Sequence, residues 1–242
     1  PRFIRLDKQF RMPKTLGDLV SDQFYIDGAL ESPLGNDPEH FGTKLKYINK
    51  YHLVWLDVPG RIGAREIKTR NGSYCRDAEA EAVVNMLSKI IKDSDKKEVK
   101  GYTYGIMTFY NGQKETLSKL ASKDSILGSM LGKGPGRIEI GSVDAFQGME
   151  FDVVILSMVR SNTGYTHAKK RFGFTTDEHR LCVALSRAKR CMIVAGDSQM
   201  MRGEYAADAI PALKEFYDMC VSEVVSDAGI FNDKNFPYPE EE

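Results

Sequence analysis

The chain has 242 residues, 42% of them hydrophobic and 28% charged, and its 34 lysine and arginine side chains balance 34 aspartate and glutamate side chains. This composition is typical of a globular protein and excludes a basic field over the whole surface, so any nucleic-acid site must be a local patch. The longest apolar runs, such as residues 153–158, are too short to span a membrane, and the four cysteines form no CxxC pair. We therefore expect a soluble, intracellular protein (cytoplasmic, nuclear or nucleoid) with no membrane contact and no metal site of its own.

Short apolar runs alternate along the chain with segments of helical periodicity. Strands are expected at residues 53–58, 104–108, 138–143, 153–158 and 191–195. Helices are expected at residues 77–92, 111–122, 177–189 and 208–220, and Asp77 is expected to cap the first of them. The alternation predicts an α/β fold with a mostly parallel sheet flanked by helices. Ligands bind along the edge where parallel strands end, and we expect the motifs below to lie mostly there.

The segments between these elements are less regular. Residues 31–50 are predicted to form an irregular connector rich in Gly, Pro, Asn and Asp, and residues 128–136 (GSMLGKGPG) a flexible loop. We expect residues 1–230 to form one domain and residues 231–242 to form a tail.

Residues 6–13 (LDKQFRMP) form the first of three segments whose side chains suit ligand binding. Gln9 could offer a hydrogen bond, Phe10 a stacking face and Arg11 a cation. Such a tripeptide occurs by chance in many proteins, so alone it indicates little.

Residues 142–160 (SVDAFQGMEFDVVILSMVR) are predicted to form a strand, a polar turn and a buried strand. Gly148 would allow close approach of the backbone to another body, and Gln147 and Glu150 flank it with groups suited to hydroxyl and phosphate neighbours. On spacing alone, a turn glycine between two core strands is the favoured interpretation.

Residues 177–190 (DEHRLCVALSRAKR) form the third segment. On a helix, Arg180 and Arg187 are seven residues apart and would project to nearly the same side. An arginine held rigidly beside a ligand can stabilise the charge that develops on a transferring phosphoryl group. A solvated cationic face near a helix end is the equal alternative.

Taken together, these segments resemble the motifs of superfamily-one helicases in order and spacing. LDKQFRM (6–12) resembles the Gln-Tyr-Arg-Met motif, YGIMTFYNGQ (104–113) the following Ile-Thr-Pro-Tyr…Gln segment, and residues 142–162 and 179–197 resemble motifs five and six. DQFYIDGAL (22–30) is similar to a stretch that follows the first motif in the group of the nonsense-mediated-decay helicase and senataxin. The resemblance implies that the chain is the second, C-terminal RecA-like motor domain of an ATP-dependent helicase or translocase.

The resemblance also implies roles for matching positions. Arg11 and Arg187 would reach across an interdomain cleft, as catalytic arginines, to the γ-phosphate of ATP. The nucleotide side of that cleft would be lined by Gln9, Phe10, Gly148, Glu150 and Arg180. Single-stranded DNA or RNA would be contacted by Thr108, Ser142, Gln147 and Arg160.

The sequence departs from the family pattern in two informative places. Phe10 stands where the family usually has Tyr, which keeps the ring but loses the hydroxyl. Residues 162–176 form a longer and more basic segment than is typical, and its Lys169 and Lys170 are further candidates for nucleic-acid contact. A solvated loop is the equal alternative for that segment.

The phosphate-binding signature of such motors is absent from the chain. No GxxxxGK[ST] motif occurs among the 242 residues. In the resembling family this motif and the acidic magnesium ligand lie on the N-terminal RecA-like domain of the same polypeptide, which would bind ATP with Mg²⁺. The chain alone is therefore expected to bind ATP weakly and not to hydrolyse it.

Two other functions remain open from the sequence. A degenerate helicase-like module could bind nucleic acid or act as a scaffold without ATPase activity. A Rossmann-type dinucleotide enzyme would need a GxGxxG motif after an early strand, and residues 59–63 (PGRIG) do not supply it.

Overall fold

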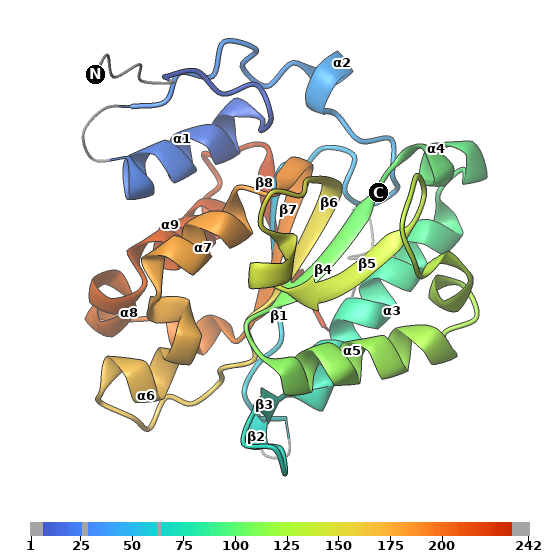
Figure 1. The fold of residues 1–242 in the computed structure, drawn as a ribbon. Coiled ribbons are helices and arrows are strands. Elements are labelled where there is room, and N and C mark those ends of the chain that lie inside the picture. Colours follow the sequence, from blue (N-terminus) through green and yellow to red (C-terminus); the bar gives the residue numbers. More distant parts are fainter. Residues whose placement is uncertain (1–6, 26–28, 62–63, 234–242) are drawn as a thin grey trace, which may run out of the picture.

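A parallel sheet of six strands forms the centre of this computed structural model, which describes residues 7–25, 29–61 and 64–233 (Figure 1). The strand order is β5-β4-β6-β7-β1-β8, and every pairing in this sheet is parallel. The strands are β1 (Leu53–Asp57), β4 (Tyr104–Thr108), β5 (Ile138–Ser142), β6 (Phe151–Ser157), β7 (Ala188–Gly196) and β8 (Ala228–Asn232). The predicted α/β class, with a RecA-like parallel sheet, is confirmed.

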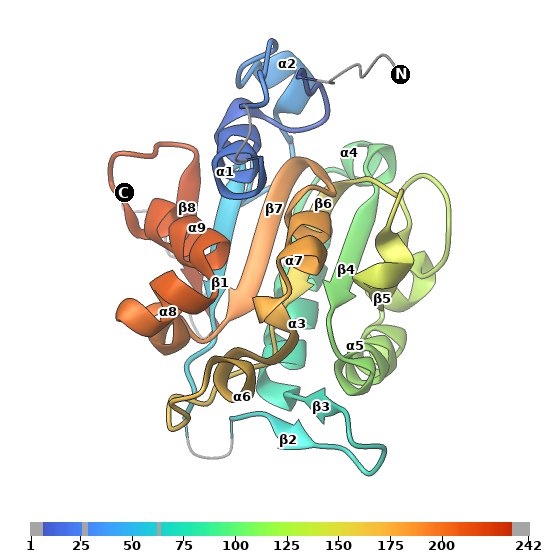
Figure 2. The same cartoon turned by 60° about the vertical axis from the view of Figure 1, so that its left-hand side comes forward.

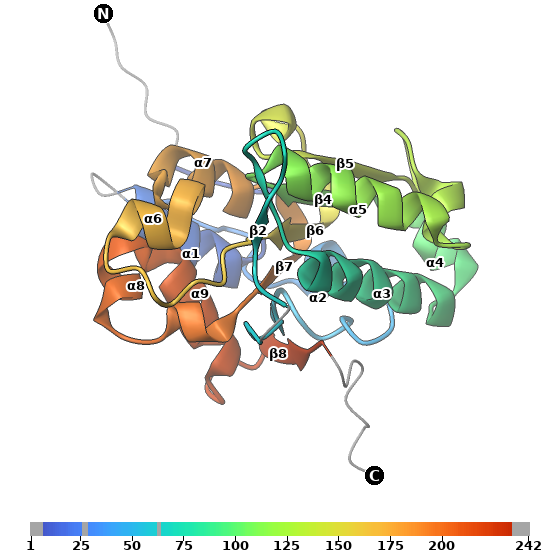
Figure 3. The same ribbon diagram turned by 90° about the horizontal axis from the view of Figure 1, so that it is seen from below.

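Helices cover both faces of the sheet (Figures 1 and 3). One face carries α3 (Asp77–Asp93) and α5 (Asn111–Lys123). The other carries α1 (Lys14–Phe24), α7 (Glu178–Leu185) and α9 (Pro211–Val221). The shorter helices are α2 (Pro38–Phe41), α4 (Lys96–Gly101), α6 (Ala168–Phe172) and α8 (Glu204–Ala209). Among the described residues, no helix is both long and apolar enough to cross a membrane.

Strand β6 illustrates how the two cores are separated. Successive side chains of a strand point to opposite faces of the sheet. Val153 and Ile155 pack in the core under α3 and α5, whereas Val154 and Leu156 pack in the core under α7 and α9. All seven residues of this strand are buried, which explains the apolar run at residues 153–156.

The helices predicted at residues 77–92 and 111–122 are present as α3 and α5, and each is one residue longer than predicted. In α3 the apolar residues Ala80, Val83 and Leu87 recur at helical spacing and are fully buried. The predicted cap is wrong by one residue, because Arg76 is the N-cap and Asp77 is the first helical residue. The carboxylate of Asp77 still lies in the first turn, where the helix dipole favours negative charge.

The third predicted helix is shorter than expected. Helix α7 ends at Leu185, and residues 188–190 belong to β7, whose first residue, Ala188, pairs with Phe151 at the start of β6. The predicted helix at 208–220 is divided at Ile210, which ends α8 and precedes Pro211, the first residue of α9.

Several elements were not predicted. They include α1, strand β8, and the small hairpin of β2 (Ile67–Lys68) and β3 (Tyr74–Cys75). Strand β8 extends to Asn232, so the expected tail loses its first two residues to the sheet. Residues 234–242 of that expected tail lie outside the described residues, as do Leu6 of the first motif and residues 26–28 of DQFYIDGAL.

The strands all run in one direction, so the sheet has one edge where strands begin and an opposite edge where they end. Helix α1 lies at the beginning edge, and α6 and the β2–β3 hairpin lie at the ending edge (Figure 2). The expectation that the motifs gather mostly at the ending edge is wrong for Arg11, Glu150 and Arg187. Glu150 directly precedes β6 and Arg187 directly precedes β7, so both lie where strands begin.

Candidate functional site

Two guanidinium groups and a carboxylate meet where β6 and β7 begin; Arg11, Glu150 and Arg187 are called the arginine cluster below. The Nε of Arg11 donates to Glu150 Oε2 at 2.9 Å, and its Nη1 donates to the backbone oxygen of Ser186 at 3.1 Å. Arg187 donates from Nη1 to the backbone oxygen of Met149 at 3.2 Å and from Nη2 to Ser186 Oγ at 2.9 Å. The chain thus brings together two arginines that are 176 positions apart in the sequence.

The arginine cluster holds more positive than negative charge. Burial and the neighbouring positive charge of Arg11 lower the pKa of Arg187. A guanidinium nevertheless stays protonated in proteins, so the two like charges remain side by side. The Glu150 side chain is half exposed and can neutralise only one of them. An anion entering the cluster would relieve this repulsion.

The position of Arg11 depends on Gln9. The Oε1 of Gln9 accepts from the backbone nitrogens of Arg11 and Met12 at 3.0 and 2.8 Å, and its Nε2 donates to Ser32 Oγ at 2.8 Å. The sequence interpretation placed Gln9 against the nucleotide, but both ends of its amide are used within the chain. Gln9 therefore shapes the turn that presents Arg11 and Phe10.

A cavity of about 430 Å³ adjoins the arginine cluster. Phe10, which is 56% exposed, lies at this cavity together with Arg11 and Glu150. The residues that the sequence interpretation missed here are His40, Phe41, Asp152, Lys189 and Arg190. The adjacent basic pair Lys189-Arg190, at the end of the third segment, was the signal that could have found part of this wall.

Asp152 fixes the two basic residues of that wall. Its carboxylate accepts from the backbone nitrogen and Oγ1 of Thr103 at 2.9 and 2.7 Å, and lies 3.3 Å from Lys189 Nζ and 3.2 Å from Arg190 Nε. Burial alone would raise the pKa of Asp152, but the hydrogen bonds from Thr103 and the charge of Lys189 outweigh it, so the pKa is lowered. The ionised carboxylate therefore stabilises the folded chain.

The pH dependence of stability should reveal this contribution. A folded-state pKa below the unfolded value gives stability that is present above the unfolded pKa and lost as the pH falls through the folded pKa. Asp152→Asn is expected to lower the free energy of unfolding by about 1–3 kcal/mol at pH 7. The gap should shrink as the pH falls below about 4. Urea unfolding of both proteins at a series of pH values measures it.

Asp208→Asn is the matched control, because Asp208 is exposed and makes no ion pair among the described residues. It should change the unfolding free energy little at any pH. A gap for Asp152→Asn that stays constant on acidification would contradict the assigned role of the carboxylate.

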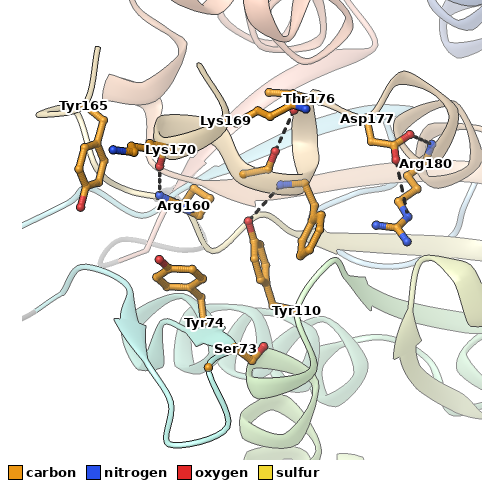
Figure 4. A pocket seen from close by; sticks show the side chains of 13 residues that line it. Ser73, Tyr74, Tyr110, Arg160, Tyr165, Lys169, Lys170, Thr176, Asp177 and Arg180 are labelled. Atoms are coloured by element: carbon orange, nitrogen blue, oxygen red, sulfur yellow. Dashed lines mark hydrogen bonds and ion pairs between the residues drawn. The ribbon is translucent and has the colours of Figure 1, made fainter. Parts of the chain in front are cut away.

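A second cavity, of about 800 Å³, lies at the opposite edge of the sheet (Figure 4). It is bounded by Tyr74 of the hairpin, Tyr110 before α5, and residues 160–180. Arg160, Lys169 and Lys170, which were predicted to contact nucleic acid, all line it.

Arg160 is buried in the wall of this cavity rather than presented at its mouth. Its Nε donates to Glu66 Oε1 at 3.2 Å, both side chains being at most 5% exposed, and its guanidinium carbon lies 4.7 Å from the centre of the Tyr74 ring. Its Nη2 also donates to the backbone oxygen of Lys170. The Arg160 charge is thus already neutralised, and the residue holds the cavity wall together instead of offering a free cation.

The small polar residues predicted at the strand ends differ in exposure. Thr108 is fully buried and its Oγ1 accepts from the Tyr110 nitrogen at 3.4 Å, so it is not presented to a strand in this structure. Ser142 is half-buried, and Gln147 is exposed. Gly148 has a φ of 83°, and an added Cβ would meet no atom within 4 Å. The glycine is therefore needed for its backbone conformation, not for a close approach within the chain.

Arg180 belongs to this second cavity and not to the arginine cluster. Its Nε lies 3.0 Å from Asp144 Oδ1, and its guanidinium carbon lies 5.3 Å from the centre of the Phe174 ring. The predicted shared side of a helix is wrong, because α7 ends before Arg187. Arg180 lies in the first turn of α7 and lines the second cavity, whereas Arg187 follows the end of α7 and directly precedes β7.

A buried ionic network supports the wall that carries Arg160. Glu79 and Arg76 form an ion pair at 3.1 Å with both side chains 0% exposed. Glu79 Oε1 accepts from Ser157 Oγ at 2.6 Å and from the Val159 nitrogen at 2.8 Å. Val159 has a φ of 72°, a conformation that a β-branched residue rarely adopts. The Glu79 carboxylate therefore helps to hold the strained turn that leads into Arg160.

The sequence interpretation missed this network, although Glu79 carried a signal. It lies four residues before Val83, on the apolar face of the predicted helix, where an unpaired carboxylate would be costly. Within the described ranges, no group of three or more His, Cys, Asp or Glu side chains could hold a metal ion.

Comparisons with known proteins agree with the motif pattern. Residues 2–199 match a family model described as an AAA domain. The chain is 32% identical over 203 residues to "Regulator of nonsense transcripts 1" of Caenorhabditis elegans, covering 83% of this chain and 17% of that protein. It is 29% identical over 202 residues to "ATP-dependent helicase NAM7" of Saccharomyces cerevisiae, covering 82% and 19%. The chain spans about a quarter or less of the curated relatives it matches.

A solved structure also overlaps the chain. It is the C-terminal domain of a possible DNA helicase from Lactobacillus plantarum WCFS1, with a TM-score of 0.44 and 12% identity, covering 93% of this chain and 99% of that one. The strand order and direction described above, rather than this overlap, define the fold.

Proposed function

The chain belongs to the AAA domain family, and from this premise we propose that it is the C-terminal RecA-like motor domain of an ATP-dependent nucleic-acid helicase or translocase. The observation that carries the proposal is the arginine cluster, in which Arg11 and Arg187 share the Ser186 turn beside Glu150. Relatives with matching motifs include a protein named as an ATP-dependent helicase. In this proposal the motor domain covers residues 1–230.

The arginine cluster fits a polyphosphate. Its two guanidinium groups lie together, and one carboxylate leaves them with a net charge of about +1 (two positive groups less one negative). The exposed ring of Phe10 stands beside them and could contact a base or a ribose. ATP with Mg²⁺ would be held mainly by an N-terminal RecA-like domain of the same polypeptide, and Mg²⁺ would neutralise phosphate charge there.

Arg187 is the better placed of the two arginines to stabilise the transition state. It is fixed by bonds to the backbone oxygens of Val183 and Met149, so its charge is held in one position before ATP arrives. The Arg11 side chain is 35% exposed, and its bond to Glu150 could be exchanged for a phosphate oxygen. Closure of the two domains would bring both groups onto the γ-phosphate, and hydrolysis would remove that attraction.

Movement along a nucleic-acid strand also requires the domain to bind that strand, at the edge of the sheet opposite the arginine cluster. Gln147 is exposed, and the exposed Lys169 and Lys170 make no ion pair among the described residues, so their groups are available to a single-stranded backbone. Alternate closure and reopening of the two domains, coupled to alternate tight and weak binding of the nucleic-acid backbone, would give directional stepping along DNA or RNA.

ATP turnover tests the proposal most simply. The 242-residue chain alone is expected to show no turnover above background, because no GxxxxGK[ST] motif occurs in it. The longer polypeptide that includes the upstream half should hydrolyse ATP, and single-stranded nucleic acid should stimulate it. A longer polypeptide that binds strands but never hydrolyses ATP would identify the alternative, a helicase-like binding or scaffolding module.

A further inference from the structure

The second cavity, called the aromatic pocket below, is lined by four aromatic rings and by basic side chains at its mouth (Figure 4). The rings belong to Tyr74, Tyr110, Tyr165 and Phe174. Its volume of about 800 Å³ lies within the range of ~300–1,000 Å³ that is usual for small-molecule sites. The sequence motifs explain none of these rings except Tyr110.

Tyr110 forms the fixed floor of the aromatic pocket. It is 3% exposed, and its ring centre lies 5.8 Å from that of Tyr74 in an edge-to-face contact. The ring of Phe174 is tilted at 5.4 Å from Tyr110, and the Phe174 nitrogen donates to the Tyr110 hydroxyl at 3.2 Å. These contacts orient Phe174 from beneath and still leave the residue 48% exposed.

Tyr165 extends from the loop on the far side of the pocket (Figure 4). It is 44% exposed, and its side chain takes part in no hydrogen bond, ion pair or ring contact among the described residues. The rings of Tyr165 and Phe174 are therefore each about half exposed around one cavity, and the Arg180 guanidinium covers part of Phe174. Such exposed rings are a usual feature of surfaces that bind a planar ligand.

The charges around the aromatic pocket divide into two kinds. Arg160 and Arg180 are neutralised by Glu66 and Asp144. Lys169 and Lys170 have no acidic partner within the described part of the chain and remain free cations at the mouth. The carboxylate that lines the pocket, that of Asp177, accepts from the Arg180 nitrogen at 3.2 Å and caps α7. The mouth therefore keeps an excess of positive charge.

We propose that the aromatic pocket takes one base of a single-stranded nucleic acid against the rings of Phe174 and Tyr165, while Lys169 and Lys170 hold the flanking phosphates. Every base has a π-face, and the combination of aromatic platforms with cations along the backbone is the chemistry that binds single strands. The inference rests on the proposed function and adds to it a contact with the bases, beside the grip on the backbone.

The test compares strands with and without a base at one position, using the complete protein. Phe174→Ala and Tyr165→Ala are each expected to weaken binding of an intact oligonucleotide by roughly 5- to 150-fold at most, the loss expected for one stacked base. Neither should weaken binding of an oligonucleotide that has an abasic residue at the bound position. A 2-aminopurine at that position should lose fluorescence on binding to the unchanged protein but not to the variants.

Control variants separate stacking from charge. Tyr205→Ala removes a comparably exposed ring outside the pocket and should leave both affinities unchanged. Lys169→Ala with Lys170→Ala should weaken the intact and abasic strands equally and reduce the salt dependence of binding.

Three outcomes decide the inference. The inference is overturned if the unchanged protein binds intact strands and strands abasic at each position in turn with equal affinity. If either strand still stimulates ATP hydrolysis, the proposed function stands. Loss of hydrolysis and of all strand binding would instead remove the proposed function. Displacement of the strand by a nucleoside monophosphate near the strand's own Kd would assign the pocket to a free nucleotide and contradict the inference.

Discussion

Arg187→Ala in the complete protein is expected to lower ATP hydrolysis by about 10³- to 10⁵-fold, the contribution usual for an arginine that stabilises phosphoryl transfer. The loss should appear in kcat, because a group held in advance at the reacting phosphate acts mainly on the transition state. Single-strand binding should stay close to that of the unchanged protein, because Lys169 and Lys170 line the aromatic pocket at the opposite edge of the sheet.

Arg202→Ala supplies the matched control for this prediction. Arg202 is exposed and forms no ion pair in the described part of the chain, so its loss should leave kcat unchanged. Arg187→Lys is expected to recover little activity, because lysine keeps the charge but cannot reproduce the three bonds that orient the guanidinium. Turnover of Arg187→Ala at the level of the unchanged protein would remove Arg187 from the chemistry.

Glu79→Ala is expected to lower the free energy of unfolding by about 3–5 kcal/mol, because it leaves the Arg76 guanidinium buried without its counter-charge. The loss also removes the acceptor for the Val159 nitrogen, which supports the strained turn before Arg160. Equilibrium unfolding in urea, followed by circular dichroism, measures the change. Glu79→Gln keeps the shape of the side chain but removes its charge. Its free energy of unfolding should lie between those of the unchanged protein and Glu79→Ala.

Lys89→Ala, on the same helix, is the control for the buried pair. Lys89 pairs with Asp93 on the surface, where solvent screens the interaction, so its loss should have a far smaller effect. A Glu79→Ala variant as stable as Lys89→Ala would show that the buried network does not stabilise the fold.

The sequence predicted the centre of the sheet well because its strands are buried on both faces. Strand β4 has the predicted bounds, and β6 differs from prediction by only a few residues. Strand β8 was missed because it reads Ala-Gly-Ile-Phe-Asn, with only its first and fourth residues buried, and so lacks a continuous apolar run. Helix α1 could have been found, since Leu16, Leu19 and Val20 recur at helical spacing.

The candidate sites were only partly predictable. Motif order pointed to Arg11, Glu150 and Arg187, and the structure brings these three side chains together. Their edge of the sheet was predicted wrongly, because Glu150 and Arg187 directly precede β6 and β7 instead of following the end of a strand. The aromatic pocket could not be predicted, since its rings come from segments that only the tertiary fold brings together.

Arg11 and Arg187 are proposed to act on the same phosphate group, and a double-mutant cycle on ATP hydrolysis measures whether they do. The rates needed are those of the complete protein, Arg11→Ala, Arg187→Ala and the variant carrying both changes. Groups that act as a unit are strongly non-additive, so the double variant should be scarcely slower than Arg187→Ala alone. Rate losses that simply multiply, or an Arg11→Ala protein with unchanged turnover, would show that the two arginines do not act together on one phosphate group.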